Sequence, residues 1–125
     1  MQRRVCVVDE RGEIYPQELS GPDQQLPAVD TLSGIPKERA VQMALRTLSP
    51  QVIVLDELGS LAETAALEQG FFSGVDFIAS VHAASAEEAA RRPQVKALQQ
   101  QGMLRVLVLL QGCAEPGRVR QIDEL

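Results

Sequence analysis

Short apolar runs occur along the whole sequence and predict the strands of a buried sheet. Four runs stand out, at residues 5–8, 52–55, 75–81 and 104–110. The run at 52–55 reads VIVL, which is too short for a buried helix and mostly β-branched, as fully buried parallel strands are. We therefore expect four strands, with 52–55 as the central one.

Helical patterns lie between these runs. The first helix is expected to begin near Pro36, and its apolar residues recur at i, i+3, i+4 and i+7. These residues are Val41, Ala44, Leu45 and Leu48. The segments 60–63 and 85–88 are capping boxes that begin further helices, and Pro93 is expected to break the second of these. Alternating strands and helices predict the α/β class, with a mainly parallel sheet and helices on both of its faces.

Two segments lack such patterns. Residues 15–34 contain three prolines and several small polar residues, which predict a long irregular loop. The tail from residue 112 onward has turn residues at Pro116 and Gly117, and we expect a short hairpin arm at 119–122.

Length, charge and cysteine content narrow the class of protein. A chain of 125 residues is expected to form one domain, 1–125. The net charge of −5 argues against a nucleic-acid partner that is held by phosphate neutralisation. No signal peptide and no apolar run of about 20 residues are present, so we expect a cytoplasmic location. Cys6 and Cys113 are far apart in the sequence, which favours neither a zinc site nor a disulfide framework.

Acid pairs follow two of the predicted strands directly. Asp56 and Glu57 come after residues 52–55, and Asp9 and Glu10 come after residues 5–8. If both strands are parallel in one sheet, their carboxyl ends share an edge, where ligands bind in open α/β sheets. An acid pair at this place is typical of a Walker B element, in which one acid serves Mg²⁺ and the next polarises water. The alternative is structural: Asp56 caps the following helix, and the other acids are solvated.

Two further side chains have open roles. His82 is the single histidine and follows the third predicted strand, where it could be structural, sense a phosphate or position water. Arg46 lies near the end of the first predicted helix, where it could favour the helix C-terminus or contact a phosphate or an acid.

Five stretches resemble, in order, the stage III sporulation protein AA family. They read VCVVDERGEI, VDTLSGIPK, MALRTLSPQVIVLDELG, SVH and RRPQVKAL. The resemblance covers nearly the whole chain, and its most specific part is LRTLSPQVIVLDELG. It implies the C-terminal portion of a RecA-like P-loop NTPase core from the secretion ATPases, which energises a channel complex between mother cell and forespore.

The resemblance also implies residue roles and partners. Asp56 would serve magnesium, Glu57 the catalytic water, and Arg105 would face nucleotide across a subunit interface. Asp9, Glu10 and Glu13 would correspond to the acidic box of these ATPases. His82 would correspond to their histidine box, and Arg46 to the arginine before the Ser-Pro step. ATP and Mg²⁺ would be the cofactors. The partners would be further copies of the chain in a homo-oligomeric ring and membrane-embedded sporulation channel proteins. These channel proteins would hold the chain at the membrane periphery.

The sequence departs from that family at nucleotide-facing positions. No GxxxxGK[ST] loop is present, so the Walker A strand and loop are missing from this partial core. Leu26-Pro27-Ala28 stands where the family has an arginine, and Ser80-Val81-His82-Ala83 replaces Thr-Ala-His-Gly. We therefore expect impaired hydrolysis by this chain alone. The alternatives are a non-enzymatic oligomerisation or docking module, and a metal-dependent hydrolase that uses Asp9, Glu10, Asp56, Glu57 and His82.

The missing strand has a structural consequence. In RecA-like sheets it lies between the strands that match residues 75–81 and 104–110. Because buried unpaired backbone groups each cost about 1–3 kcal/mol, we expect one of two outcomes. Either these two strands pair directly, or another segment or a neighbouring chain fills the place between them.

Overall fold

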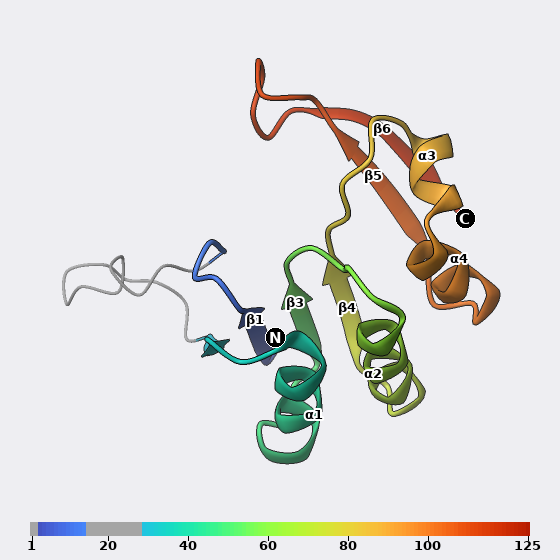
Figure 1. Cartoon of the computed structure of the whole chain (residues 1–125). Coiled ribbons are helices and arrows are strands. Elements are labelled where there is room, and N and C mark those ends of the chain that lie inside the picture. The colour runs from blue at the N-terminus through green and yellow to red at the C-terminus, as the bar shows by residue number, and fades with distance from the viewer. Residues whose placement is uncertain (1–2, 15–28) are drawn as a thin grey trace. The chain divides into compact units, whose positions relative to one another are not determined.

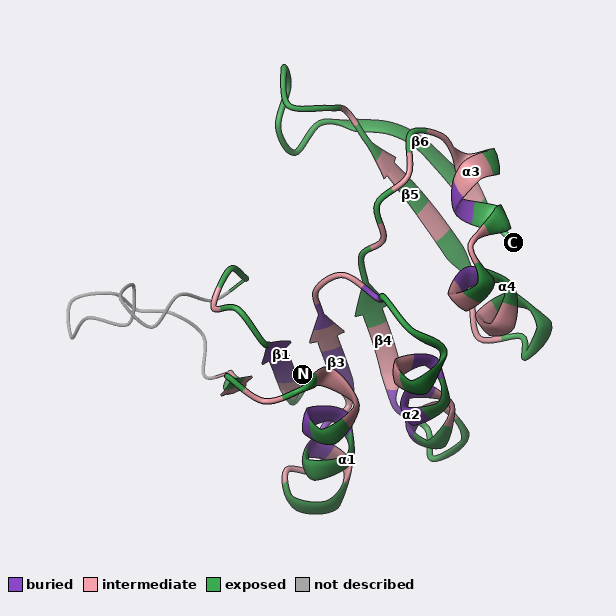
Figure 2. Cartoon of the chain, viewed as in Figure 1, coloured by how far each residue is buried: buried purple, intermediate pink, exposed green. Residues whose placement is uncertain are grey.

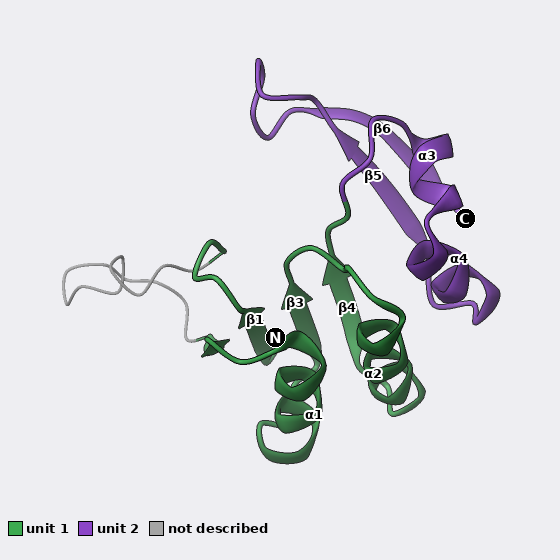
Figure 3. Ribbon diagram, in the orientation of Figure 1, with its two compact units in different colours: residues 1–81 green, residues 82–125 purple. Residues whose placement is uncertain are grey.

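The computed structural model describes residues 3–14 and 29–125 and divides the chain into two compact units, 1–81 and 82–125 (Figures 1 and 3). The first unit contains β1 (Val5–Asp9), β2 (Asp30–Ser33), α1 (Lys37–Thr47), β3 (Val52–Leu55), α2 (Leu61–Phe72) and β4 (Asp76–Ala79). The second contains α3 (Ala86–Arg91), α4 (Pro93–Gln100), β5 (Val106–Leu110) and β6 (Val119–Glu124). Each unit is described by itself, and the expectation of a single domain stays a prediction.

The first unit is a parallel four-stranded sheet in the order β2-β1-β3-β4. The chain crosses from β2 through α1 to β3 and from β3 through α2 to β4, each time in the same direction along the sheet. Right-handed crossovers in one direction place their helices on one face, and α1 and α2 do contact each other there (Figure 1). The predicted α/β class with a mainly parallel sheet is confirmed, although both described helices of this unit cover the same face.

The core of the first unit lies between the helices and that face of the sheet. In the register of the sheet, Cys6 pairs with Ile53 and Ile53 with Phe77, so these residues share a face. Figure 2 shows the buried stripe along β1, β3 and the inner sides of both helices. Its buried members are Cys6, Val8, Ile53, Leu55, Ala40, Val41, Ala44, Ala66 and Leu67.

Strand β2 is a correction to the sequence analysis. Residues 30–33 were expected to belong to a long loop, but they pair with β1. The strand reads DTLS, which has neither an apolar run nor many β-branched residues, so its pairing with β1 and not local composition makes it a strand. Residues 15–28 of the expected loop lie outside the described residues.

The helical part of the second unit follows the prediction. Ser85 caps α3 through a bond from the Glu88 amide, and α3 ends at Arg91. Pro93 then occupies the first turn of α4, where its missing N–H costs nothing. Among the described helices of both units, none is long and apolar enough to cross a bilayer.

The strand predicted at 104–110 is found as β5, and its described partner β6 contains the hairpin arm predicted at 119–122. Among the described residues β5 pairs with β6 as an antiparallel hairpin, and β4 pairs with β3. Direct pairing between the third and fourth predicted strands stays a prediction, because β4 and β5 belong to different units. The turn around Pro116 and Gly117 brings β6 to β5 over a short loop, and closing a short loop costs less entropy than a distant pairing. That another segment or chain pairs beside β4 stays a prediction.

Candidate functional site

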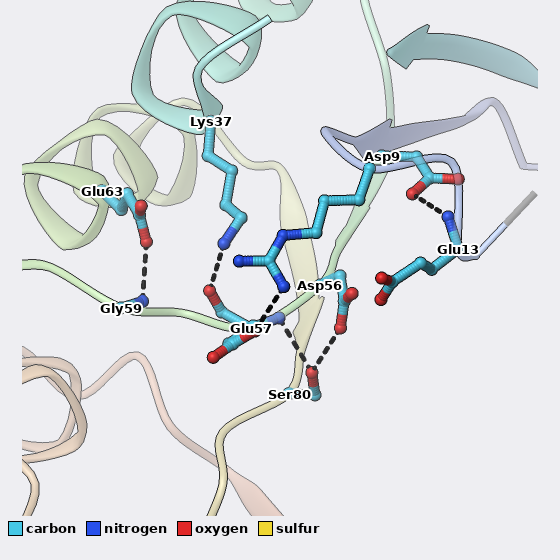
Figure 4. A network of polar contacts seen from close by, with 9 residues as sticks. Asp9, Glu13, Lys37, Asp56, Glu57, Gly59, Glu63 and Ser80 are labelled. Atoms are coloured by element: carbon cyan, nitrogen blue, oxygen red, sulfur yellow. Dashed lines mark hydrogen bonds and ion pairs between the residues drawn. The ribbon is translucent and has the colours of Figure 1, made fainter. Parts of the chain in front are cut away.

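Both acid pairs leave the sheet at the same edge. β1 and β3 are parallel neighbours in which Val8 pairs with Leu55, so Asp9 and Asp56 are the next residues on adjacent strands. The expected meeting of the two pairs at the carboxyl edge is confirmed, and Figure 4 shows the polar contacts there. The two pairs nevertheless differ in what their carboxylates contact.

Asp9 uses its carboxylate to fold the segment that follows it. Its side chain is fully buried, and its Oδ1 and Oδ2 accept hydrogen bonds from the backbone amides of Glu13 (2.8 Å) and Ile14 (3.0 Å). Both oxygens are thus engaged within the loop. Glu10 and Glu13 themselves are exposed. Asp9 therefore holds the segment 10–14 in place. A ligand at this edge would meet Glu10 and Glu13 before it met Asp9.

Ser80 binds the Asp56–Glu57 segment from the end of the neighbouring strand. Its hydroxyl donates to Asp56 Oδ1 at 3.1 Å and accepts from the Glu57 amide at 2.9 Å (Figure 4). Its backbone carbonyl accepts from the Leu58 amide at 2.8 Å. Since β3 and β4 are parallel neighbours, their carboxyl ends bring these residues together. One residue therefore contacts three successive residues after β3.

Glu57 has an unusual backbone conformation. Its φ is 45°, in the left-handed region that residues with side chains rarely adopt. Lys37 Nζ, from the first turn of α1, donates to the Glu57 carbonyl, and Arg11 Nη1 lies 3.9 Å from Glu57 Oε2. Such a conformation costs about 1–3 kcal/mol and persists where surrounding contacts enforce it. Here Lys37 holds the carbonyl of Glu57 and Ser80 holds its amide.

The start of α2 settles one structural alternative. Ser60 is its N-cap and accepts from the Glu63 amide at 3.2 Å. Glu63 Oε2 in turn accepts from the Gly59 amide at 2.8 Å, one residue before the cap. The predicted capping box is therefore present, and the alternative in which Asp56 caps this helix is wrong. Asp56 is left at the edge of the sheet, half-buried, beside Ser80.

The structure does not bring Arg46 to these acids. Strand β2 ends at the carboxyl edge and β3 begins at the opposite edge, so α1 runs from the first edge to the second. Arg46 is exposed in the last turn of α1, at the edge away from Asp56. Within the first unit this position suits the helix C-terminus. Its predicted contact with a phosphate or an acid stays a prediction.

His82 and Arg105 belong to the second unit. His82 is exposed, and its backbone carbonyl accepts from Arg92 Nη2 at 2.8 Å. Arg105 is exposed just before β5, and its backbone carbonyl accepts from the Leu125 amide at 2.8 Å. Their predicted roles beside the acids of the first unit stay predictions.

Three residues of the site were missed as contacts in the sequence analysis. Ser80 was noted only as a departure from a family pattern, and Lys37 and Arg11 were not considered. The available signal was position: Ser80 directly follows a predicted strand that neighbours the acid-bearing strand, and Lys37 opens the helix above it. Only the pairing of β3 with β4 shows that Ser80 reaches Asp56.

Asp56 is suited to be a single protein ligand of a hydrated magnesium ion, rather than part of a metal site built from protein side chains alone. Within residues 3–14 and 29–125, no three His, Cys, Asp or Glu side chains are grouped to hold a metal ion. The metal-dependent hydrolase considered above stays a prediction, because His82 belongs to the other unit. Mg²⁺ usually keeps several waters and takes one or two carboxylates together with substrate phosphates. Asp56 is half-exposed and its Oδ2 is not used in the bond from Ser80, so it can serve as such a ligand.

The cysteine near this site is not a nucleophile. Cys6 is fully buried in β1. Its burial raises the pKa of the thiol from 9.0 to about 11, and the negative charge of Asp30 adds a smaller part of this rise. Because the thiolate is the reactive form, this residue is inert at neutral pH. Its role is to fill the core behind the acid pairs.

Comparison with known proteins places the chain in a family. A family model described as "Sporulation stage III, protein AA" matches residues 2–124. Stage III sporulation protein AA of Bacillus subtilis (strain 168) is 33% identical over 117 residues, which cover 93% of this chain and 38% of that protein. The chain thus spans well under half the length of this relative. With a match over nearly all of its residues, the chain belongs to the family of sporulation stage III protein AA.

Proposed function

We propose that the carboxyl edge of the first unit is the magnesium and water side of a nucleotide site in a RecA-like sporulation ATPase. Asp56 takes the magnesium ion, and Glu57 orients and polarises the attacking water. The observation that carries this proposal is the strained turn at Glu57, directly after Asp56, at the ligand-binding edge of a parallel sheet. When bound, Mg²⁺ would neutralise part of the negative charge on the phosphates of ATP.

The arrangement supports separate roles for the two acids. Asp56 Oδ1 is held by Ser80, which fixes the direction of its remaining oxygen. Glu57 is half-exposed, and its carboxylate lies within ion-pair distance of Arg11. A carboxylate that is accessible and lies beside a cation can orient a water molecule and act as its general base. In this proposal the function of the strained backbone is to direct the Glu57 carboxylate toward the ligand.

Residues 1–125 contain no GxxxxGK[ST] sequence. In P-loop enzymes the amides and lysine of this loop hold the β- and γ-phosphates, so these residues alone lack that support. We therefore propose weak Mg²⁺-dependent ATP binding and impaired hydrolysis by this chain, as a portion of the ATPase. In the cell it would act in a homo-oligomeric ring in the cytoplasm, held at the membrane by sporulation channel proteins and energising their channel between mother cell and forespore.

The test is the binding of a fluorescent ATP analogue, followed by anisotropy with and without Mg²⁺. We expect Mg²⁺ to tighten binding, Asp56→Asn to remove that gain, and Glu57→Gln to retain it. Asp76→Asn is the matched control, because Asp76 lies at the opposite edge of the same sheet and pairs with Arg3 at 2.7 Å. Binding that Mg²⁺ does not change, or that Asp56→Asn leaves intact, would overturn the proposal. Robust ATP turnover lost in Glu57→Gln would instead show that hydrolysis is not impaired.

A second candidate function is a non-enzymatic oligomerisation or docking module. It is favoured by the β5–β6 hairpin, whose exposed apolar side chains are Val106, Val108, Leu110, Val119 and Ile122, between 49% and 61% accessible. Adjacent exposed apolar residues of this number mark interaction surfaces more often than chance. Light scattering after size-exclusion chromatography separates the two candidates. A nucleotide-independent oligomer that Val108→Asp dissociates supports the module, and a monomer at every concentration argues against it.

A further inference from the structure

The contacts around Glu57 assign a role to a residue outside the acid pairs. We propose that Ser80 is a positioning residue, whose hydroxyl holds the Asp56 carboxylate and the Glu57 backbone in the arrangement that Mg²⁺ and water require. The inference rests on the proposed function. It concerns Ser80 alone, and it can be tested in the absence of any turnover.

A serine hydroxyl offers one donor and two acceptor positions. Ser80 spends the donor on Asp56 Oδ1 at 3.1 Å and one acceptor position on the Glu57 amide at 2.9 Å. The hydroxyl therefore couples the side chain of one acid to the backbone of the next. A carbonyl group could not replace it, because a carbonyl has no proton to donate to Asp56.

The backbone of Ser80 already performs the structural task. Its carbonyl accepts from the Leu58 amide at 2.8 Å, which ties the end of β4 to the turn after β3. That bond is present with any side chain at position 80. The described hydrogen bonds of the hydroxyl go to Asp56 and to Glu57. Its contribution is thus directed at the two acids rather than at the fold as a whole.

The strained backbone explains why such a contact matters. With φ at 45°, Glu57 tends to relax to an ordinary conformation, which would turn its carboxylate to another direction. Lys37 holds the carbonyl of Glu57 and Ser80 holds its amide, so the two peptide groups of this residue are fixed from two sides. Groups that orient a metal ligand or a base typically affect affinity or rate by 10- to 100-fold when they are removed. Removing the Ser80 hydroxyl should therefore release one of these two restraints.

The first test is amide hydrogen exchange of Glu57 and Leu58 in the whole chain and in Ser80→Ala and Ser80→Thr. The Glu57 amide bonds the side chain of Ser80, whereas the Leu58 amide bonds its backbone, so Leu58 is an internal control. We expect Ser80→Ala to speed exchange at Glu57 by about fivefold, as the loss of one hydrogen bond predicts. Leu58 should be unchanged, and Ser80→Thr should retain the protection. Unchanged exchange at Glu57, or equal acceleration at both amides, would overturn the inference.

The second test measures Mg²⁺-dependent binding of the fluorescent ATP analogue. We expect Ser80→Ala to reduce the gain that Mg²⁺ confers by about tenfold, Ser80→Thr to restore it, and binding without Mg²⁺ to be the same in all three proteins. A loss that is equal with and without Mg²⁺ would overturn the positioning role. If the unmodified chain shows no Mg²⁺ dependence, the proposed function fails. The exchange experiment still decides separately whether Ser80 sets the turn.

Discussion

The left-handed conformation of Glu57 predicts that glycine at this position stabilises the first unit relative to alanine. Both Glu57→Gly and Glu57→Ala remove the carboxylate, so the loss of its 3.9 Å ion pair with Arg11 cancels in the comparison. Glycine avoids a steric cost of about 1–2 kcal/mol in the left-handed region. It also gives the unfolded chain more freedom, which costs about 0.4–1 kcal/mol. The net expectation is that Glu57→Gly has a free energy of unfolding about 0.5–1 kcal/mol higher than Glu57→Ala.

Urea unfolding followed by NMR is the appropriate assay, because amide signals of β3 report on the first unit even if the second unfolds separately. Two matched pairs of variants calibrate the result. At Ser49, whose φ is 46°, glycine should again be more stable than alanine. At Glu68, inside α2, glycine should be about 1 kcal/mol less stable than alanine.

The reasoning is refuted if the Glu57 pair behaves like the Glu68 pair. Glycine less stable than alanine at position 57 would mean that the turn has no left-handed residue there. The link that we draw between strain and function would then lose its basis. If instead the Glu57 pair follows the Ser49 pair, glutamate is held at a position where glycine would be more stable, as expected where a site needs that side chain.

Two further predictions concern buried groups of β1. Asp9→Ala should lower the free energy of unfolding by about 3 kcal/mol, since two hydrogen bonds to a buried carboxylate are lost. The exposed neighbour serves as its control: Glu10→Ala should change the value by less than about 0.5 kcal/mol in urea unfolding, and equal losses would contradict the assigned role. Ellman's reagent should label the exposed Cys113 rapidly in the native protein and Cys6 only after unfolding, whereas similar native rates would show that Cys6 is accessible. Because burial raises the Cys6 pKa from 9.0 to about 11, its contribution to stability is complete below pH 9 and is lost as the pH rises toward 11.

Much of the local structure follows from short stretches of sequence. The run VIVL at 52–55 forms β3 with the predicted bounds, because a short apolar run with three buried residues has few alternatives to a central strand. The two capping boxes begin α2 and α3 as expected, since the cap bonds join residues only three apart. Pro93 divides the second helical segment because it cannot donate a helical hydrogen bond. The edge shared by Asp9 and Asp56 also follows, once both strands are taken as parallel.

Interactions between distant residues decided the rest. Residues 30–33 become a strand because β1 offers an unpaired edge, and nothing in DTLS announces this. The strand at 106–110 pairs with β6 because the turn around Pro116 brings a nearby partner, although its apolar run equally suits a parallel sheet.

Ser80 is the clearest case for the site itself. It lies 24 positions from Asp56, and only the pairing of β3 with β4 brings its hydroxyl to that carboxylate. The sequence alone determined which residues form the local elements and which edge carries the acids, because those depend on neighbours along the chain. The tertiary structure decided which strands pair and what holds Glu57, because a hydrogen bond between distant residues exists only after the sheet has formed.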